Sequence, residues 1–231
     1  MRVWRSRPGL YGRQGPLLQR LAAMALVLCA ILMATAARAA GPLKIVALGD
    51  SLTAGHGLPA QAAFPARLEA ALHAKGETVT IANAGVSGDT ASDGLDRLDW
   101  SVPQGTDAVI LELGANDALR GIDPKVTQAA LEKILARLAI RKIPVLLAGM
   151  QAPRNMGADY AREFDAIYPA LAATHAVVFY PFFLDGIATE AKLNQADGLH
   201  PNPAGVAVIV KRILPSVEEL IARARRAHGS D

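Results

Sequence analysis

LKIVALGDSLTAG, residues 43–55, is the stretch that decides the fold. Its first six residues, Leu43–Leu48, are almost all apolar and include β-branched side chains, as expected of a strand buried on both faces. Small and polar residues follow at once, with Ser51 between Gly49 and Gly55. A buried strand that ends in such a loop is typical of a parallel sheet, where functional side chains gather at the carboxyl ends of the strands.

Short apolar runs of the same kind recur along the chain and alternate with segments of helical periodicity. The predicted further strands are Val79–Ala82, Ala108–Leu113, Pro144–Ala148 and Ala176–Tyr180. Helices are predicted for 61–75, Pro124–Arg141 with Asp123 as its cap, 159–173, and from a cap at Asn202 to about Arg223, after which the polar tail is expected to fray. The alternation predicts one α/β domain, with a parallel sheet covered by helices on both faces.

Residues 1–39 have a different character from the rest. Five arginines and no acidic residue precede an apolar run, Leu21–Ala37, which is followed by the small-x-small site Ala37-Arg38-Ala39. This pattern predicts a secretory signal peptide and a mature domain of residues 40–231, exported to the periplasm or secreted. The alternative is an uncleaved membrane anchor, but a run of roughly 17 residues is near the lower limit for spanning a bilayer.

Charge and cysteine content exclude several classes of function for the mature chain. Six of the 24 basic residues, and none of the 21 acidic ones, lie in residues 1–39, so 18 basic and 21 acidic residues remain, a net charge of −3. Nucleic acid is therefore not an expected partner, and no stable membrane anchor is expected after cleavage. Cys29, the one cysteine, lies in the predicted signal peptide, so no disulfide or thiolate metal site is expected. No metal-ligand cluster is visible, and no cofactor is predicted.

The loops after the first two predicted strands contain candidate site residues. Ser51 is either a nucleophile or an ordinary helix cap. A phosphate loop is excluded, because no lysine follows and Asp50 would repel phosphate. In the second loop, Gly85 and Gly88 permit either a plain turn or the close approach of the backbone to a ligand.

Two later segments complete the candidate site. Asn116 follows the third strand, where its amide could stabilise an oxyanion or simply form a turn with Asp117. Asp197 and His200 stand three residues apart before the last helix, so the carboxylate could orient the imidazole as a general base.

Taken in order, these segments resemble the four sequence blocks of the SGNH, or GDSL, hydrolases. The blocks are GDSLTAG, NAGVSGDT, ELGANDALRG and DGLHPN, which contain Ser51, Gly88, Asn116 and His200. The chain is most similar to the small exported thioesterase, lysophospholipase and arylesterase group. The resemblance implies a three-layer, flavodoxin-like α/β/α fold with five parallel strands. It also implies a triad of Ser51, Asp197 and His200, and an oxyanion hole formed by the Ser51 and Gly88 backbone N–H groups and the Asn116 amide. The choice of Gly88 over Gly85 rests on the family pattern alone.

The resemblance also implies the substrate class: acyl esters or thioesters, including lysophospholipids, hydrolysed by a monomer. In similar enzymes the segment matching 118–123 is a mobile loop over the acyl chain, but Ala115 and Ala118 stand where glycine is common, and alanine has less backbone freedom. The expected substrate-binding residues are Leu119, Arg120, Met150 and Pro153. Four more side chains either line the same groove or pack in the core: Met156, Phe182, Phe183 and Leu184. His56 is a further candidate for the cleft.

Three alternatives remain at this level. A carbohydrate O-acetylesterase of the same fold would accept acetyl groups and reject longer ones. A periplasmic binding protein without catalysis would have no need of Ser51, Asn116, Asp197 and His200 together. A conventional α/β-hydrolase would need the motif G-x-S-x-G, which the sequence lacks.

Overall fold

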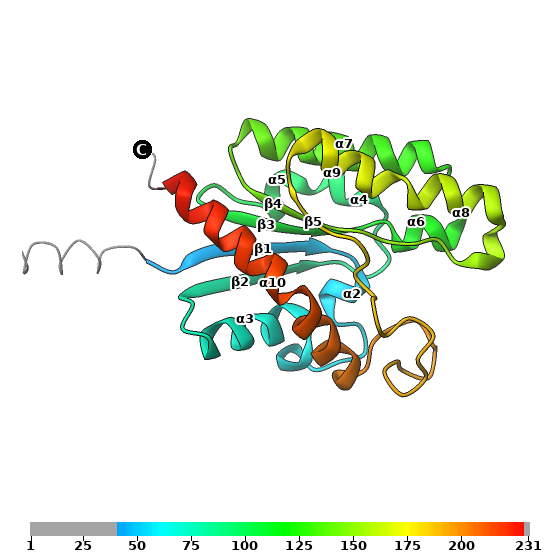
Figure 1. Cartoon of the computed structure of the whole chain (residues 1–231), viewed down its shortest axis with the longest axis horizontal. Helices are drawn as coiled ribbons and strands as arrows, with labels where there is room; N and C mark the ends of the chain where they lie inside the picture. The colour runs from blue at the N-terminus through cyan, green and yellow to red at the C-terminus, as the bar shows by residue number, and fades with distance from the viewer. Residues whose placement is uncertain (1–40, 229–231) are drawn as a thin grey trace, which may run out of the picture. The chain divides into compact units, whose positions relative to one another are not determined.

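Five parallel strands form a single sheet in the order β2-β1-β3-β4-β5 (Figure 1). The computed structural model describes residues 41–228. The strands are β1 (Leu43–Gly49), β2 (Val79–Gly85), β3 (Ala108–Glu112), β4 (Val145–Ala148) and β5 (Val178–Tyr180). The five predicted strands are confirmed, although β2 continues beyond Ala82 because its ladder with β1 runs on to the pair Gly49 and Gly85.

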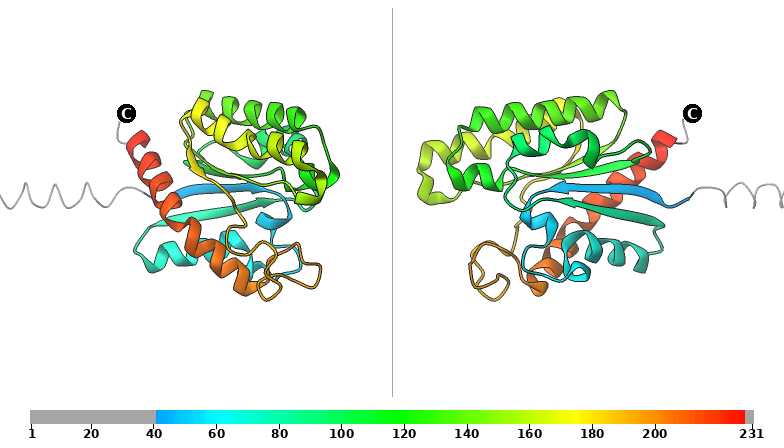
Figure 2. Two further views of the ribbon diagram at one scale, coloured as in Figure 1. Left: turned by 45° about the vertical axis from the view of Figure 1, so that its right-hand side comes forward. Right: turned by 180° about the vertical axis from the view of Figure 1, so that it is seen from behind.

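Helices cover both faces of the sheet (Figures 1 and 2). One face carries α4 (Ala91–Asp96), α5 (Leu98–Ser101), α7 (Pro124–Ile140) and α9 (Ile167–His175). The other face carries α3 (Phe64–Ala74) and α10 (Pro203–His228). Shorter elements are α2 (Ser51–Ala54), α6 (Ala115–Arg120), α8 (Ala158–Asp165) and the 3-10 turns η1 (Ala60–Ala62) and η2 (Arg154–Met156). The predicted single α/β domain with a five-stranded parallel sheet is confirmed.

The caps predicted for the two long helices are present. The Asp123 carboxylate accepts a hydrogen bond from Lys125 N (2.9 Å) at the start of α7. The Asn202 side chain accepts from Ala204 N and Gly205 N at the start of α10. One face of α7 is also buried through Ala130, Leu131, Ile134, Leu135 and Leu138, whereas Val126 is 49% exposed.

Two of the predicted helices are divided in the structure. The segment 159–173 forms two helices, α8 and α9, which meet at Ala166. Pro169 explains the break, because it has no N–H to donate to the carbonyl of Asp165 in a continuous helix. The segment 61–75 is a 3-10 turn followed by α3.

The prediction of a frayed end after Arg223 is wrong, since α10 continues to His228. Ala224 is buried against the core, and Arg225 forms an ion pair with Glu77 before β2. Tertiary contacts therefore hold a helix end that its polar composition alone would leave loose.

Between residues 41 and 228, no helix has the length and apolar content needed to cross a membrane. The predicted signal peptide lies outside the described residues.

Candidate active site

Ser51 and His200 meet at the carboxyl end of the sheet, although they come from distant parts of the chain. Ser51 opens α2 directly after β1, and His200 lies in the loop before α10. The His200 Nε2 atom is 3.0 Å from Ser51 Oγ, and its Nδ1 atom is 2.7 Å from Asp197 Oδ2. The three side chains thus form a continuous hydrogen-bonded series from hydroxyl to imidazole to carboxylate.

The loop that contains His200 fixes the Asp197 carboxylate. Its Oδ1 atom accepts hydrogen bonds from Leu199 N (2.9 Å) and His200 N (3.0 Å). These bonds, chiefly the one from the His200 backbone, and the contact with the His200 ring hold the pKa of Asp197 well below its usual range. Asp197 is therefore a carboxylate at neutral pH and an acceptor for an imidazole Nδ1–H.

Asn116 lies in the first turn of α6, beside Asp50, the residue that precedes Ser51. Its Nδ2 atom donates to Asp50 Oδ2 (3.1 Å) and to the Asp89 carbonyl (3.0 Å). The other Asp50 oxygen accepts from Leu52 N (2.9 Å) and so caps α2. One buried carboxylate therefore contacts both the helix of Ser51 and the amide of Asn116.

Asp50 and Glu112 form a buried acidic pair beneath Ser51. Burial raises the pKa of Asp50 to about 6, partly offset by the bonds from Leu52 and Asn116. Burial and the charge of Asp50 raise the pKa of Glu112 well above its usual range. The Thr53 hydroxyl donates to Glu112 Oε2 (2.6 Å), whereas Oε1 has no partner among the described residues. Glu112 thus ties α2 to β3 through Thr53, and its burial favours the protonated form.

The structure separates the two candidate glycines of the second loop. Gly85 ends β2, where an added Cβ would lie 2.2 Å from Ala54 N, so its role is to let α2 pack on the strand. Gly88 has a φ of +94° in the following turn. Arg120 Nη2 donates to the Gly88 carbonyl (2.7 Å), so this side chain contacts the Gly88 turn and does not line the pocket described below.

Arg97 contacts the ends of β1 and β2 and the turn that contains Gly88. No sequence motif identifies this residue. Its guanidinium is buried, pairs with Asp89 through Nε (2.6 Å) and donates to the carbonyls of Gly49 (2.8 Å) and Ala84 (2.9 Å). It also donates to the Ser101 hydroxyl (2.9 Å). No local pattern marks this residue, because most of its partners come from three other segments of the chain.

A cavity of about 280 Å³ opens beside Ser51 and His200. Its apolar lining includes three of the predicted substrate-binding residues, Leu119, Met150 and Pro153, together with Phe182, Leu184 and Leu199. Phe183 is buried in the core, edge-on to Phe64, and Met156 is not among the lining residues. The segment 118–123, expected as a mobile loop, contains the end of α6 and its C-cap, Gly121. The Tyr160 hydroxyl donates to the Ile122 carbonyl (2.8 Å) and so anchors the residues after the cap.

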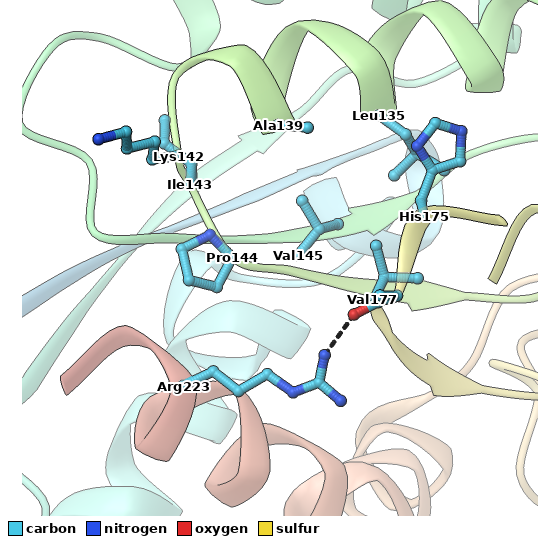
Figure 3. Close-up of a pocket in the computed structure, with 10 residues that line it drawn as sticks. Leu135, Ala139, Lys142, Ile143, Pro144, Val145, His175, Val177 and Arg223 are labelled. Carbon is cyan, nitrogen blue, oxygen red and sulfur yellow. Dashed lines mark hydrogen bonds between the residues drawn. The ribbon is translucent and has the colours of Figure 1, made fainter. Parts of the chain in front are cut away.

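A second cavity, of about 300 Å³, lies at the amino ends of β4 and β5 (Figure 3). Its walls include Pro144, Val145 and Val177, and Arg223 extends across it to the Ala176 carbonyl. Since the two cavities are of similar size, size does not identify the active site. Of these two cavities, only the one beside Ser51 has a hydroxyl that is hydrogen-bonded to an imidazole.

His56 lies against the imidazole of His200, with ring centroids 4.5 Å apart, but it is not among the residues that line the cavity beside Ser51. Within residues 41–228, no three His, Cys, Asp or Glu side chains are grouped so that they could hold a metal ion.

Comparison with known proteins gives consistent matches. Residues 47–208 match the GDSL-like Lipase/Acylhydrolase family. The chain is 41% identical to an arylesterase of Vibrio mimicus over 161 residues, which cover 69% of this chain and 80% of that enzyme. It is 39% identical to the thioesterase 1/protease 1/lysophospholipase L1 of Escherichia coli over 166 residues, 71% of this chain and 78% of that protein. The crystal structure of AlinE4, an SGNH-hydrolase family esterase, superposes with a TM-score of 0.67 at 44% identity, covering 78% of this chain and 97% of AlinE4.

Proposed function

The chain belongs to the GDSL-like lipase/acylhydrolase family and is a carboxylic ester hydrolase, and from this premise we propose that it cleaves acyl esters through Ser51, His200 and Asp197. One observation carries the proposal: the hydrogen-bonded series of these three side chains ends at the mouth of an apolar cavity. The nucleophile, the base and the space for an acyl chain thus meet at one place.

In the proposed reaction, His200 Nε2 removes the proton from Ser51 Oγ as that oxygen attacks the acyl carbonyl carbon. The Asp197 carboxylate accepts from Nδ1–H, which keeps Nε2 unprotonated before attack and stabilises the imidazolium that forms. His200 then donates its proton to the leaving alcohol, leaving an acyl group on Ser51. Water, deprotonated by the same imidazole, attacks the acyl-enzyme, and His200 returns that proton to Ser51 Oγ as the acid leaves.

The oxyanion of each tetrahedral intermediate is proposed to lie among the Ser51 N–H, the Gly88 N–H and the Asn116 amide. Both hydrogens of that amide already face acceptors, so the oxyanion shares them with Asp50 and the Asp89 carbonyl. One such donor typically lowers the barrier by about 3–4 kcal/mol. The contacts of Asp50 with the Asn116 amide, and of Arg120 with the Gly88 carbonyl, support this placement because they limit the motion of both donor groups.

The proposed substrates are acyl esters whose chain occupies the apolar cavity, with thioesters and lysophospholipids as members of the same class. The names of the similar enzymes, an arylesterase and a thioesterase/lysophospholipase, support this range. We also propose that residues 1–39 direct export and are then removed, on the strength of their basic, apolar and small-x-small pattern.

The test is hydrolysis of chromogenic acyl esters from acetyl to long chains by the full chain, with Ser51→Ala and Asp197→Asn in parallel. We expect activity in the parent, near-background rates for Ser51→Ala, and a large loss of kcat for Asp197→Asn. Full activity of Ser51→Ala would refute the assignment of the nucleophile. Strict preference for acetyl esters would instead favour a carbohydrate O-acetylesterase.

A further inference from the structure

The short contact between Ser51 and His200 poses a structural problem. The two residues are 149 positions apart in the sequence and lie on different loops, one after β1 and one before α10. A single hydrogen bond between two side chains does not fix the separation of the loops that hold them. Because catalysis by a general base depends steeply on this distance, the fold must hold the loops by another contact.

Gln195 supplies such a contact. Its Nε2 atom donates to the His56 carbonyl (2.7 Å), in the loop that follows Ser51. The same atom also donates to the Pro201 carbonyl (3.0 Å), next to His200. Within residues 41–228, only the Gln195–His56 hydrogen bond and the Ser51–His200 bond join the segments 49–58 and 193–202.

The backbone completes a closed circuit through the same side chain. Gln195 N donates to the His200 carbonyl (2.7 Å), and His56 N donates to the Ser51 carbonyl (3.0 Å). The path from Ser51 through His56 and Gln195 to His200 is therefore hydrogen-bonded at each step. It connects the main chain of the proposed nucleophile to the main chain of the proposed base.

Gly57 makes room for this contact. Its φ is +72°, and a Cβ at this position would lie 2.3 Å from Gln195 Oε1. Any larger residue would push the amide away from the His56 carbonyl. The Ser51 loop therefore has a recess that fits the Gln195 side chain.

We propose that Gln195 is a positioning residue, which sets the separation of Ser51 Oγ and His200 Nε2 by joining their two loops. The proposal rests on the proposed function of Ser51 and His200. It assigns Gln195 no contact with substrate, so its loss is expected to lower kcat and to leave KM nearly unchanged.

The test compares Gln195→Met, which keeps the length of the side chain but removes the donor, with Gln128→Met on the exposed side of α7 as the matched control. We expect kcat to fall about tenfold to a hundredfold in Gln195→Met, since misplacement of about 1 Å has effects of this size. KM should stay within about twofold, and Ser51 should react with a fluorophosphonate more slowly by the same factor as kcat. Gln128→Met should match the parent in all three measurements.

Gly57→Ala provides a second, independent variant, because it displaces the Gln195 amide without changing it. Its loss of kcat should not add to that of Gln195→Met in the double variant, since both break one contact. Parental kcat in either single variant, or full additivity, would overturn the proposal while Ser51→Ala stays inactive. If Ser51→Ala retains activity, the proposed function fails and the role of Gln195 fails with it.

Discussion

At the scale of a single residue, the buried carboxyl of Asp50 is an energetically unfavourable group that the candidate site nevertheless contains. Its carboxyl is buried at the end of β1, where it caps α2 and contacts Asn116. Burial raises its pKa from the ordinary 3.8 to about 6, which means that the charged form needed for these contacts is costly in this place. A small apolar residue would avoid this cost, but it could not accept both hydrogen bonds.

This cost predicts a pH dependence of stability. Between about pH 4 and pH 6 the folded chain keeps a proton on Asp50 that the unfolded chain has lost, so the free energy of unfolding falls as the pH rises through this range. In Asp50→Asn the decrease from pH 4.5 to pH 7.5 should be smaller by roughly 2 kcal/mol, as measured by urea unfolding. Asp96→Asn, at an exposed position on α4, should keep the parental slope. Equal slopes for all three proteins would contradict the protonation of Asp50 in this range.

At the scale of elements, the site is the meeting of loops that follow neighbouring strands, and Arg97 ties them together. Its guanidinium bonds the ends of β1 and β2 and the Asp89 carboxylate next to the Gly88 turn. The Asp89 carbonyl in turn accepts from Asn116. The proposed oxyanion donors are thus positioned by an ion pair that lies below the sheet end, away from the cavity.

Removing this cation should be far more damaging than removing an exposed one. Arg97→Met leaves Asp89 and two carbonyls without their partner, and we expect a loss of about 3–5 kcal/mol in the free energy of unfolding. The control is Arg137→Met, which breaks the pair with Asp99 whose side chains are 42% and 73% exposed, and which should cost less than about 1 kcal/mol. Urea unfolding of both variants measures the difference. Similar losses in the two proteins would show that Arg97 contributes no more than a surface ion pair.

At the scale of the whole molecule, the cavity beside Ser51 is assembled from parts of the chain that are distant in sequence. Leu119 comes from α6, Met150 follows β4, Leu184 follows β5, and Leu199 belongs to the loop of His200. Its volume of about 280 Å³ is a property of their packing and of no single segment.

Because the cavity walls come from separate segments, a substitution in one wall should change the acyl-chain preference of the enzyme. Leu184→Trp adds bulk to the cavity, so kcat/KM for long-chain esters should fall about tenfold or more, whereas acetyl esters should be hydrolysed at close to the parental rate. Val126→Trp adds the same side chain on the exposed surface of α7 and should leave the profile unchanged. A uniform loss across all chain lengths in Leu184→Trp would mean that the chain does not enter this cavity.

Much of this molecule follows from local sequence. The five strands were predictable because each is a short apolar run with β-branched residues, and the caps at Asp123 and Asn202 because they depend on side chains within three residues. The residues gathered at the candidate site were predictable because parallel strands place their following loops at one edge of the sheet. Local signals were insufficient where distant partners decide: the continuation of α10 past Arg223 and the burial of Phe183.

The sequence by itself therefore determined the α/β class, the strands and the types of reactive side chain, because periodicity, caps and residue chemistry act over a few neighbouring positions. Only the tertiary structure decided the 3.0 Å approach of His200 to Ser51, the packing of α2 against Gly85, and the placement of Arg120 on the Gly88 carbonyl. It also decided the roles of Arg97 and Gln195. These depend on contacts between segments far apart in the chain, and such contacts are set by the packing of the whole core rather than by any local pattern.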